Sequence, residues 1–279
     1  TQGVVSQTVS DKIESYDSLL ENTIANRWDL DSFYLDKSRI SIGLYYKNDN
    51  VTLLHPDSSK VCASLIADSF SAFPYFNVSA YQNSVKSYSQ AFNNARKSNY
   101  DYFGIVNFDE NERENSISID LYVTATGSLA KKWNVYRTGN KKLFAAVEKL
   151  VLDMVSSFET RGKILQRKSN QVLIDLGKRD GITLDSYFVV AKKDEVKIAD
   201  SGIGLILSED MELGFVELIE VGEDISVGTF VQKGFYDKMN PNDEIFLVAK
   251  DTDKEKSSNL KAQPEKTSPE LLEMLNSIK

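Results

Sequence analysis

The sequence predicts an α+β protein, in which a mixed sheet with helices in the order β-α-β-α-β-β-β-α is followed by a small SH3-like β-barrel or sandwich. Helical and strand patterns alternate up to about residue 160, and short strands separated by glycine turns follow after it. The change falls within residues 161–192, RGKILQRKSNQVLIDLGKRDGITLDSYFVVAK. A chain of 279 residues is long enough for two ordinary domains, each with its own core.

Four segments are therefore expected. Residues 1–38 form an N-terminal helical segment, residues 39–160 the α/β domain, residues 161–250 the small β-domain, and residues 251–279 a disordered linker with a short C-terminal helix. Residues 251–268 have almost no apolar content, which is typical of a linker. Residues 269–278 again contain apolar side chains and are predicted to form the short C-terminal helix. A helix of this length is not stable alone, so it needs a surface to bind.

The N-terminal segment places Ile13, Tyr16, Leu20 and Ile24 three or four residues apart, which predicts one apolar stripe on a helix over residues 10–28. A partner must cover this stripe. It either packs on the following domain or pairs with a helix of a longer protein, and the sequence leaves both alternatives open.

In the α/β domain, the β-branched and aromatic run at residues 40–46 predicts the first strand. A helix is expected near residues 58–72, a strand at 76–81 and a more polar helix at 84–98. The apolar run at 101–108 is typical of a central strand with both faces covered. One face of the first helix carries its apolar side chains: Val61, Cys62, Leu65, Ile66 and Phe70.

Two alternating strands, 116–126 and 130–138, flank a Thr-Gly-Ser hairpin signal. A helix over residues 140–158 ends the domain. It ends only a few residues before the next strand, so we expect the two domains to be fixed relative to each other. Its broad apolar stripe predicts a buried face made of Leu143, Phe144, Val147, Leu150, Val151, Met154, Val155 and Phe158.

The second domain begins with two predicted strands, 172–177 and 186–190, joined by a tight glycine-containing turn. Asp175 and Asp180 flank this turn, and we expect their side-chain oxygens to accept turn N–H groups, a structural role. Four further strands are predicted at residues 202–207, 213–221, 228–232 and 243–248.

Composition excludes several classes of function. A net charge of −8 argues against a protein that binds nucleic acid or anionic lipid, because both need a basic surface. The one dense basic patch, interpreted as a solvated face, is Arg161, Lys163, Arg167 and Lys168. No apolar run of about 18 residues occurs, so no membrane span is predicted. The sequence begins TQGVVSQ without Met, which suits either a mature chain after signal removal or a trimmed one.

Candidate catalytic residues are few, because the chain has one histidine and one cysteine. His55 in a polar loop lacks a nearby Ser or Cys nucleophile with an orienting carboxylate, so it is interpreted as a surface residue rather than a general base. Cys62 lies on an apolar helix stripe and is interpreted as a buried side chain rather than a reactive thiol. It can form no internal disulfide, and the redox compartment stays open.

Other candidate sites have structural interpretations. The oxygens of Asp109, Asn111, Glu112 and Glu114 lack the glycine and terminal glutamate of a calcium loop. Gly202-x-Gly204 lacks the third glycine of a dinucleotide site. An acidic series could dock a basic partner, although a solvated face is commoner: Glu209, Asp210, Glu212, Glu217, Glu220, Glu223 and Asp224. We therefore predict no catalytic, cofactor-binding or metal-binding residue, no cofactor, and no enzymatic activity.

Three local patterns resemble a known group of proteins. Residues 95–106 (ARKSNYDYFGIV) and 121–127 (LYVTATG) resemble the N-terminal domain of TolB and related envelope proteins of the curli-secretion and penicillin-binding-protein-activator type. Residues 161–190 are similar to the start of the C-terminal domain of the flagellar H-ring protein FlgT, whose middle domain is TolB-like. The resemblance spans roughly residues 40–248 and implies a periplasmic, non-enzymatic envelope protein.

The leading hypothesis is a structural or assembly protein of a flagellar motor ring or collar, which contacts other flagellar or envelope proteins or further copies of itself. The alternative is an envelope regulator that binds and activates a cell-wall synthesis enzyme. A third hypothesis is a hydrolase that uses His55. No nucleic acid is expected among the partners.

Overall fold

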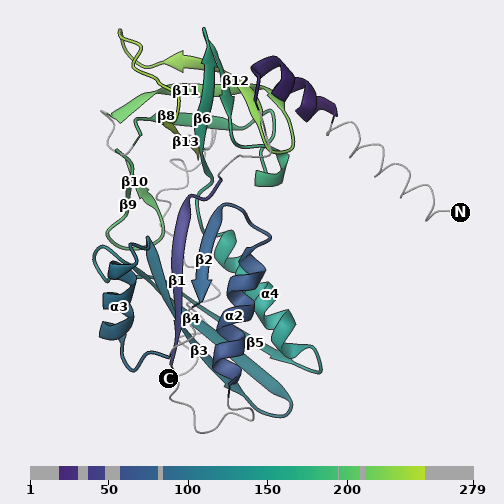
Figure 1. Cartoon of the computed structure of the whole chain (residues 1–279), viewed down its shortest axis with the longest axis vertical. Helices are drawn as coiled ribbons and strands as arrows, with labels where there is room; N and C mark the ends of the chain where they lie inside the picture. Colours follow the sequence, from purple (N-terminus) through teal and green to yellow (C-terminus); the bar gives the residue numbers. More distant parts are fainter. Residues whose placement is uncertain are drawn as a thin grey trace, which may run out of the picture. The chain divides into compact units, whose positions relative to one another are not determined.

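The first part of the chain folds into a five-stranded mixed sheet with the strand order β2-β1-β3-β4-β5 (Figure 1). The computed structural model describes residues 19–30, 37–47, 57–80, 84–193, 195–207 and 211–248. β1 is parallel to β2 and β3, and the remaining neighbours are antiparallel. The strands are β1 (Ile40–Tyr46), β2 (Phe76–Ala80), β3 (Tyr102–Glu110), β4 (Glu114–Val123) and β5 (Leu129–Thr138).

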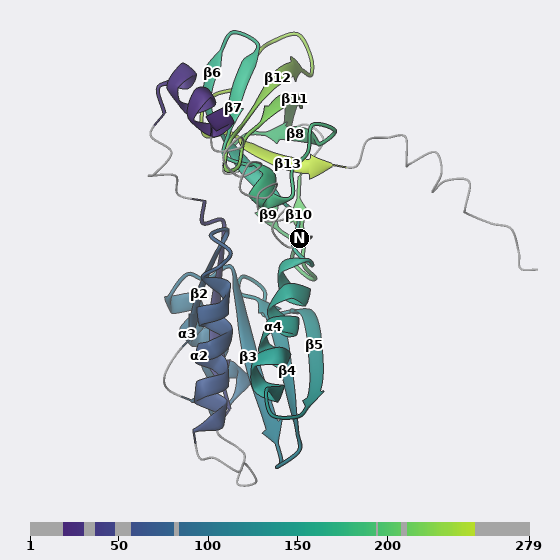
Figure 2. The same ribbon diagram turned by 90° about the vertical axis from the view of Figure 1, so that its right-hand side faces the viewer.

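Helices cover both faces of this sheet. α2 (Ser58–Phe70) and α4 (Lys142–Val155) lie on one face, and α3 (Tyr88–Lys97) lies on the other (Figures 1 and 2). α3 begins later than the predicted residue 84, because the Ser87 hydroxyl oxygen accepts the Gln90 N–H as an N-cap. The element order and the central position of β3 are as predicted, and the α+β class is confirmed.

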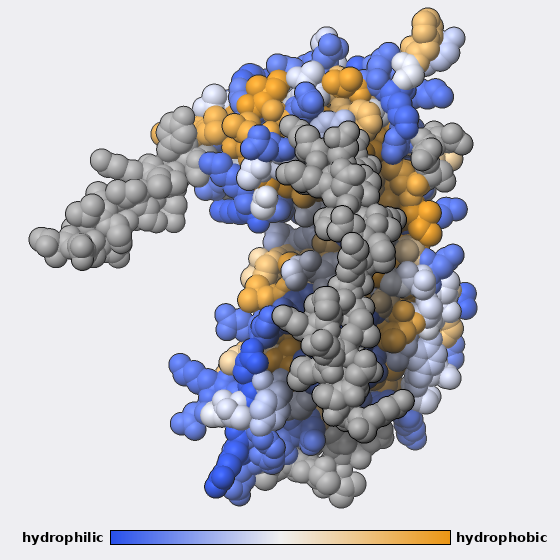
Figure 3. Space-filling view, turned by 180° about the vertical axis from the view of Figure 1, so that it is seen from behind, coloured by the Kyte–Doolittle hydropathy of each residue, from blue (hydrophilic) through white to orange (hydrophobic). Residues whose placement is uncertain are grey.

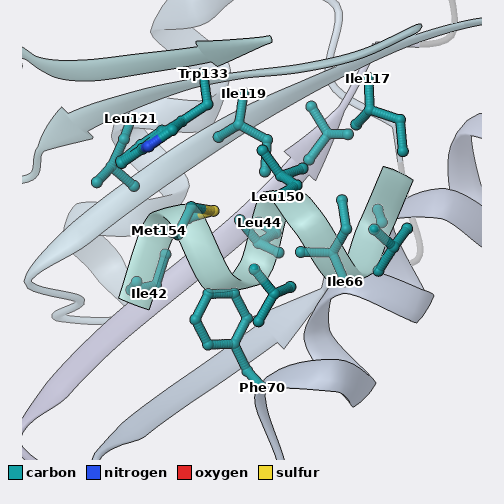
Figure 4. Packing of buried hydrophobic residues seen from close by; sticks show 14 of the residues in the cluster. Ile42, Leu44, Ile66, Phe70, Ile117, Ile119, Leu121, Trp133, Leu150 and Met154 are labelled. Carbon is teal, nitrogen blue, oxygen red and sulfur yellow. The ribbon is translucent and has the colours of Figure 1, made fainter. Parts of the chain in front are cut away.

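The main core lies between the sheet and the α2–α4 layer. Side chains alternate along the strands, so Ile42 and Leu44 enter this core while Tyr45 packs under α3. The alternation predicted for the strand at 116–126 is confirmed in β4, where Ile117, Ile119, Leu121 and Val123 are buried. Figure 4 shows how the following residues of this core interlock: Ile42, Leu44, Ile66, Phe70, Ile117, Ile119, Leu121, Trp133, Leu150 and Met154. Two predicted core residues, Val61 and Phe144, are instead exposed on their helices.

The second part of the chain is a closed barrel with the strand order β11-β12-β7-β6-β13-β8, so the barrel alternative holds and the sandwich does not. Its strands are β6 (Arg161–Lys168), β7 (Gln171–Ile174), β8 (Tyr187–Ala191), β11 (Glu212–Val221), β12 (Ser226–Gln232) and β13 (Glu244–Val248). The interior is apolar and includes Ile164, Val172, Phe188, Val216 and Ile245.

The predicted hairpin between residues 172–177 and 186–190 is wrong. β7 lies between β12 and β6, whereas β8 lies between β13 and β11. The connection between them is long, passes through the 3-10 helix η2 (Lys178–Asp180), and buries Leu176 and Ile182 in the barrel core. A tight turn could not bury these side chains, so the connection packs into the barrel core instead of reversing the chain directly.

The strand predicted at residues 202–207 is also shorter than expected. β10 (Leu205–Ile206) pairs only with β9 (Lys197–Ile198), and Gly202 at φ +81° lies in the turn between them. Ile198 and Ile203 pack against the core of the sheet. The Thr126 hydroxyl donates a 2.7 Å hydrogen bond to the Asp200 carbonyl. This small hairpin therefore links the barrel chain to the turn between β4 and β5.

Residues 19–28 form a helix that packs on the barrel. Ile24, Ala25 and Trp28 share a buried cluster with Leu173 and Val227. The described part of the predicted stripe, Leu20 and Ile24, thus packs on the barrel and not on the α/β sheet that follows it in sequence. Ile13, Tyr16, the predicted linker and the C-terminal helix lie outside the described residues.

Candidate protein-binding cleft

Buried charges lie where the chain enters the sheet from the N-terminal segment. The Arg39 guanidinium, directly before β1, pairs with the Asp175 carboxylate at the end of β7. Asp175 is 2% exposed and also accepts a 2.6 Å hydrogen bond from the Lys163 backbone N–H. Burial raises the pKa of the Asp175 carboxyl group, while Arg39 and the Lys163 N–H act in the opposite direction. The pair ties the first strand of the sheet to the barrel.

Lys37 makes a second connection two residues earlier. Its ammonium lies 3.0 Å from the Asp180 carboxylate and 3.1 Å from that of Asp224. Only 8% of the Lys37 side chain is exposed, so both ion pairs are shielded from water. The Asp180 carboxylate also accepts the Gly177 N–H at 2.9 Å. Lys37 therefore holds the η2 turn and the β11–β12 turn together.

Tyr75 joins the sheet to the first barrel strand through backbone groups. Its hydroxyl donates to the Glu159 carbonyl at 3.0 Å and accepts the Arg161 N–H at 2.7 Å. The Arg161 guanidinium in turn donates to the Arg39 carbonyl. Burial raises the pKa of Tyr75, so the phenol stays neutral and can keep both bonds.

A cleft of about 550 Å³ opens beside these contacts, and we call it the junction cleft. It has the size of sites that hold a peptide side chain or a small ligand. The loop between α2 and β2, the start of β2, the end of α4 with the residues after it, and the two barrel turns contribute to it. Most of the lining is apolar, and it consists of Ala72, Phe73, Pro74, Tyr75, Phe76, Val155, Phe158, Glu159, Thr160, Arg179, Asp180 and Asp224.

The charged side of the junction cleft is held in place by ion pairs. Arg179 donates to Asp224 at 3.0 Å and to Glu223 at 3.3 Å. Among the lining residues, three carboxylates (Glu159, Asp180 and Asp224) face one cation, Arg179. The cleft thus offers aromatic side chains beside a surplus of negative charge, which suits an apolar group next to a cation.

Of the candidate site residues singled out from the sequence, Asp180 and Asp224 line this cleft, and the other described candidate sites lie elsewhere. His55 lies outside the described residues. Asn111 organises the β3–β4 turn, since its Oδ1 accepts the Arg113 and Glu114 N–H groups at 2.9 Å. Within the described ranges, no group of three or more His, Cys, Asp or Glu side chains is placed to hold a metal ion. Gly202 and Gly204 lie in the β9–β10 hairpin and open no helix.

Several charges expected to be solvated instead have partners within the chain. Glu212 pairs with Lys233, and Glu220 pairs with Arg27 at 2.6 Å. From the basic patch, Arg167 pairs with Asp237. The Lys168 ammonium lies 4.8 Å from the centre of the Trp28 ring. Of the two turn aspartates, Asp180 accepts a turn N–H as predicted, whereas Asp175 binds a neighbouring strand and Arg39.

Sequence reasoning missed Lys37, Arg39 and Tyr75. Each meets its partner across a separation of 84 or more residues, for example 136 between Arg39 and Asp175. No local pattern marks such a pair. A lysine and an arginine two residues apart directly before an apolar strand are the only signal that the sequence carries.

Cys62 is fully buried in α2, and burial raises the pKa of its thiol to about 12. Because the thiolate is the reactive form, native protein at pH 8 is expected to resist alkylation by iodoacetamide. Unfolding in urea should return the thiol to its ordinary pKa and speed the reaction on the order of 100-fold or more. Mass spectrometry of samples with and without urea measures this. Rapid alkylation of the native protein would contradict the buried position.

Comparisons with known proteins give a match over the sheet domain. The family model TPASS_0648_2nd, described as a second domain, matches residues 39–156, which run from the start of β1 to the end of α4. A search of the curated proteins finds no match. Within the described residues, no helix is long and apolar enough to cross a membrane.

Solved structures show distant similarity. The chain is similar to a PelC dodecamer from Paraburkholderia phytofirmans, with 17% identity, TM-score 0.34, and coverage of 44% of this chain and 88% of that chain. The LpoB C-terminal domain from Salmonella enterica has 11% identity and a TM-score of 0.29, and the match covers 37% of this chain and 84% of that chain. TolB from Acinetobacter baumannii has 8% identity and a TM-score of 0.32, and the match covers 49% of this chain and 36% of that chain. Scores at this level carry no argument about activity or partners.

Proposed function

We propose that this protein is a non-enzymatic, periplasmic component of the cell envelope that binds another protein through the junction cleft. The cleft itself is the observation that carries the proposal, because it presents Phe73 and Phe158 beside charged turns that ion pairs hold in place. The envelope location rests on the resemblance of residues 95–106, 121–127 and 161–190 to envelope proteins.

The chemistry of the junction cleft defines the partner. Its aromatic wall favours a bulky apolar or aromatic side chain, and such anchors contribute most of the affinity at protein interfaces. The adjoining carboxylates favour a Lys or Arg close to that anchor. The partner segment is therefore a surface loop or peptide with an apolar anchor next to a basic residue, consistent with the net charge of −8 on this chain. Association should weaken as salt concentration rises.

Blocking the cleft tests the proposal. Ala72 is exposed and lines the cleft, so Ala72→Arg should fill its mouth without disturbing the core, and should weaken binding to the envelope partner at least about 10-fold. Ser71→Arg adds the same side chain one residue away, outside the cleft lining, and serves as the matched control. Affinity is measured by biolayer interferometry with the purified partner. Equal affinity for both variants would refute binding through the cleft.

The more specific form of the proposal is a component of a flagellar motor ring or collar. It rests on the similarity of residues 161–190 to a flagellar ring protein. Deletion of the gene should remove a ring or collar density from motors seen by cryo-electron tomography. Motors with every density intact in the deletion strain would exclude this role and leave the cleft proposal standing.

The alternative is a regulator that binds and activates a cell-wall synthesis enzyme. It rests on the similarity of residues 95–106 to penicillin-binding-protein activators. The purified chain should then bind a glycosyltransferase or transpeptidase and raise its rate of glycan synthesis, and Ala72→Arg should reduce the stimulation. If the chain neither binds such an enzyme nor raises its rate of synthesis, this alternative is excluded.

A further inference from the structure

Two aromatic side chains that do not line the junction cleft project from the barrel. Phe235 is 88% exposed and Tyr236 is 73% exposed, and their rings contact each other edge to face at 5.1 Å. Soluble proteins rarely expose adjoining large aromatic residues without an interaction to make. We call residues 233–239, between β12 and β13, the aromatic loop.

The base of the aromatic loop is held firmly. The Lys233 N–H donates to the Leu213 carbonyl at 2.8 Å, and Asp237 forms an ion pair with Arg167. Met239 is buried in the barrel core. The loop is thus anchored on both sides of its tip, and the two rings are presented to solvent instead of folding back onto the barrel.

A separate apolar cavity of about 640 Å³ lies on the same barrel, and we call it the barrel pocket. Leu184 and Ile219, which line it, are 59% and 46% exposed. The remaining apolar lining comes from Leu20, Ile182 and Val221. Figure 3 shows that hydrophobic side chains gather on the surface of the barrel, in the upper part of the view. The cavity volume is sufficient for two aromatic rings.

The aromatic loop and the barrel pocket lie at opposite ends of β11. The loop contacts the start of this strand at Leu213, and the pocket includes Val221 at its end. From Leu213 to Val221 the strand advances eight residues at roughly 3.3 Å each, a separation of about 26 Å. The loop, anchored at Leu213, therefore does not reach the pocket of its own chain.

We propose that the aromatic loop of one copy inserts into the barrel pocket of a second copy, in a head-to-tail contact. The charges agree with this pairing, because Lys238 is exposed beside the rings while Asp185 and Glu217 are exposed near the pocket. A contact between two different surfaces leaves one loop and one pocket free, so it can continue into a ring or filament. This contact is independent of the junction cleft.

The contact should be weak and reversible. Two aromatic side chains bury roughly 150–250 Å² each, so the total area stays near the lower limit of specific interfaces. Analytical ultracentrifugation of the full chain should show an average mass that rises with concentration. A double variant, Phe235→Ser with Tyr236→Ser, should lower the association constant on the order of 30-fold or more. Leu184→Glu, at an exposed position of the pocket, should do the same.

Mixing the two variants gives the decisive result. The Leu184→Glu chain keeps its loop and the serine variant keeps its pocket, so an equimolar mixture should form a 1:1 dimer and grow no further. Phe144→Ser, at a 65% exposed position on α4, is the control and should leave association unchanged. A wild-type chain that stays monomeric, self-association insensitive to both variants, or a mixture that remains monomeric would each overturn the proposal.

Discussion

Replacing Asp175 by alanine is expected to destabilise the protein by about 3–5 kcal/mol, one of the largest effects of a single substitution in this chain. The Arg39 side chain is 6% exposed, so its guanidinium would lose a buried carboxylate partner. The Lys163 N–H would lose its acceptor as well. The loss measures the removal of one partner from a buried pair, not the net contribution of the pair. Arg39→Met should have a similar cost, because it leaves the buried carboxylate without its cation.

Removing both members together should be far less damaging. The double variant Arg39→Met with Asp175→Leu replaces the ion pair by apolar groups, which is often neutral in buried sites, so its cost should fall well below the sum of the two single variants. Urea unfolding followed by tryptophan fluorescence measures all three. Trp133 reports on the sheet and Trp28 on the barrel.

An exposed ion pair provides the control for these measurements. Lys149 and Asp153 on α4 form a 2.5 Å pair with side chains 49% and 35% exposed. Lys149→Ala should therefore change the free energy of unfolding by at most about 0.5 kcal/mol. If Asp175→Ala costs no more than Lys149→Ala, the Arg39–Asp175 pair does not contribute to joining sheet and barrel.

The sheet domain was predictable because its signals are local. Period-2 alternation placed β4 and β5, Gly127 marked the turn between them, and apolar spacing placed α2 and α4. Val61 and Phe144 were predicted to be buried and are exposed, and both errors have the same cause. A sequence stripe shows which residues are apolar, but the width of the covered face depends on how α2 and α4 lie against the sheet and each other.

The barrel was predicted less well because closure depends on distant pairing. β7 and β8 look like a hairpin, yet each finds its neighbours elsewhere in the chain. The junction cleft was not predictable for the same reason, since its charged side depends on contacts such as that between Lys37 and Asp224. The exposed pair Phe235–Tyr236 is visible in the sequence, but only burial distinguishes it from core residues.

Gly177 and Gly181 show how space, and not backbone conformation alone, determines the cost of a substitution. Gly181 has φ +78° in the left-handed region, and nothing lies within 4 Å of where its Cβ would be. Gly177 has an extended backbone that any residue can adopt, yet a Cβ there would lie 2.2 Å from the Glu223 carbonyl oxygen. Gly177→Ala must therefore push the η2 turn away from the β11–β12 turn.

Gly177→Ala is thus expected to destabilise the protein by about 3 kcal/mol through backbone displacement. Gly181→Ala should cost only about 1–2 kcal/mol, the strain of a left-handed alanine. Displacing the turns also separates Asp180 from Asp224, so the Lys37 connection should be lost together with stability. Urea unfolding ranks the variants by their free energy of unfolding. Adding Lys37→Met to Gly177→Ala should lower this free energy little further. The reverse ranking, with Gly181→Ala the more damaging, would mean that the two turns are not in contact as described.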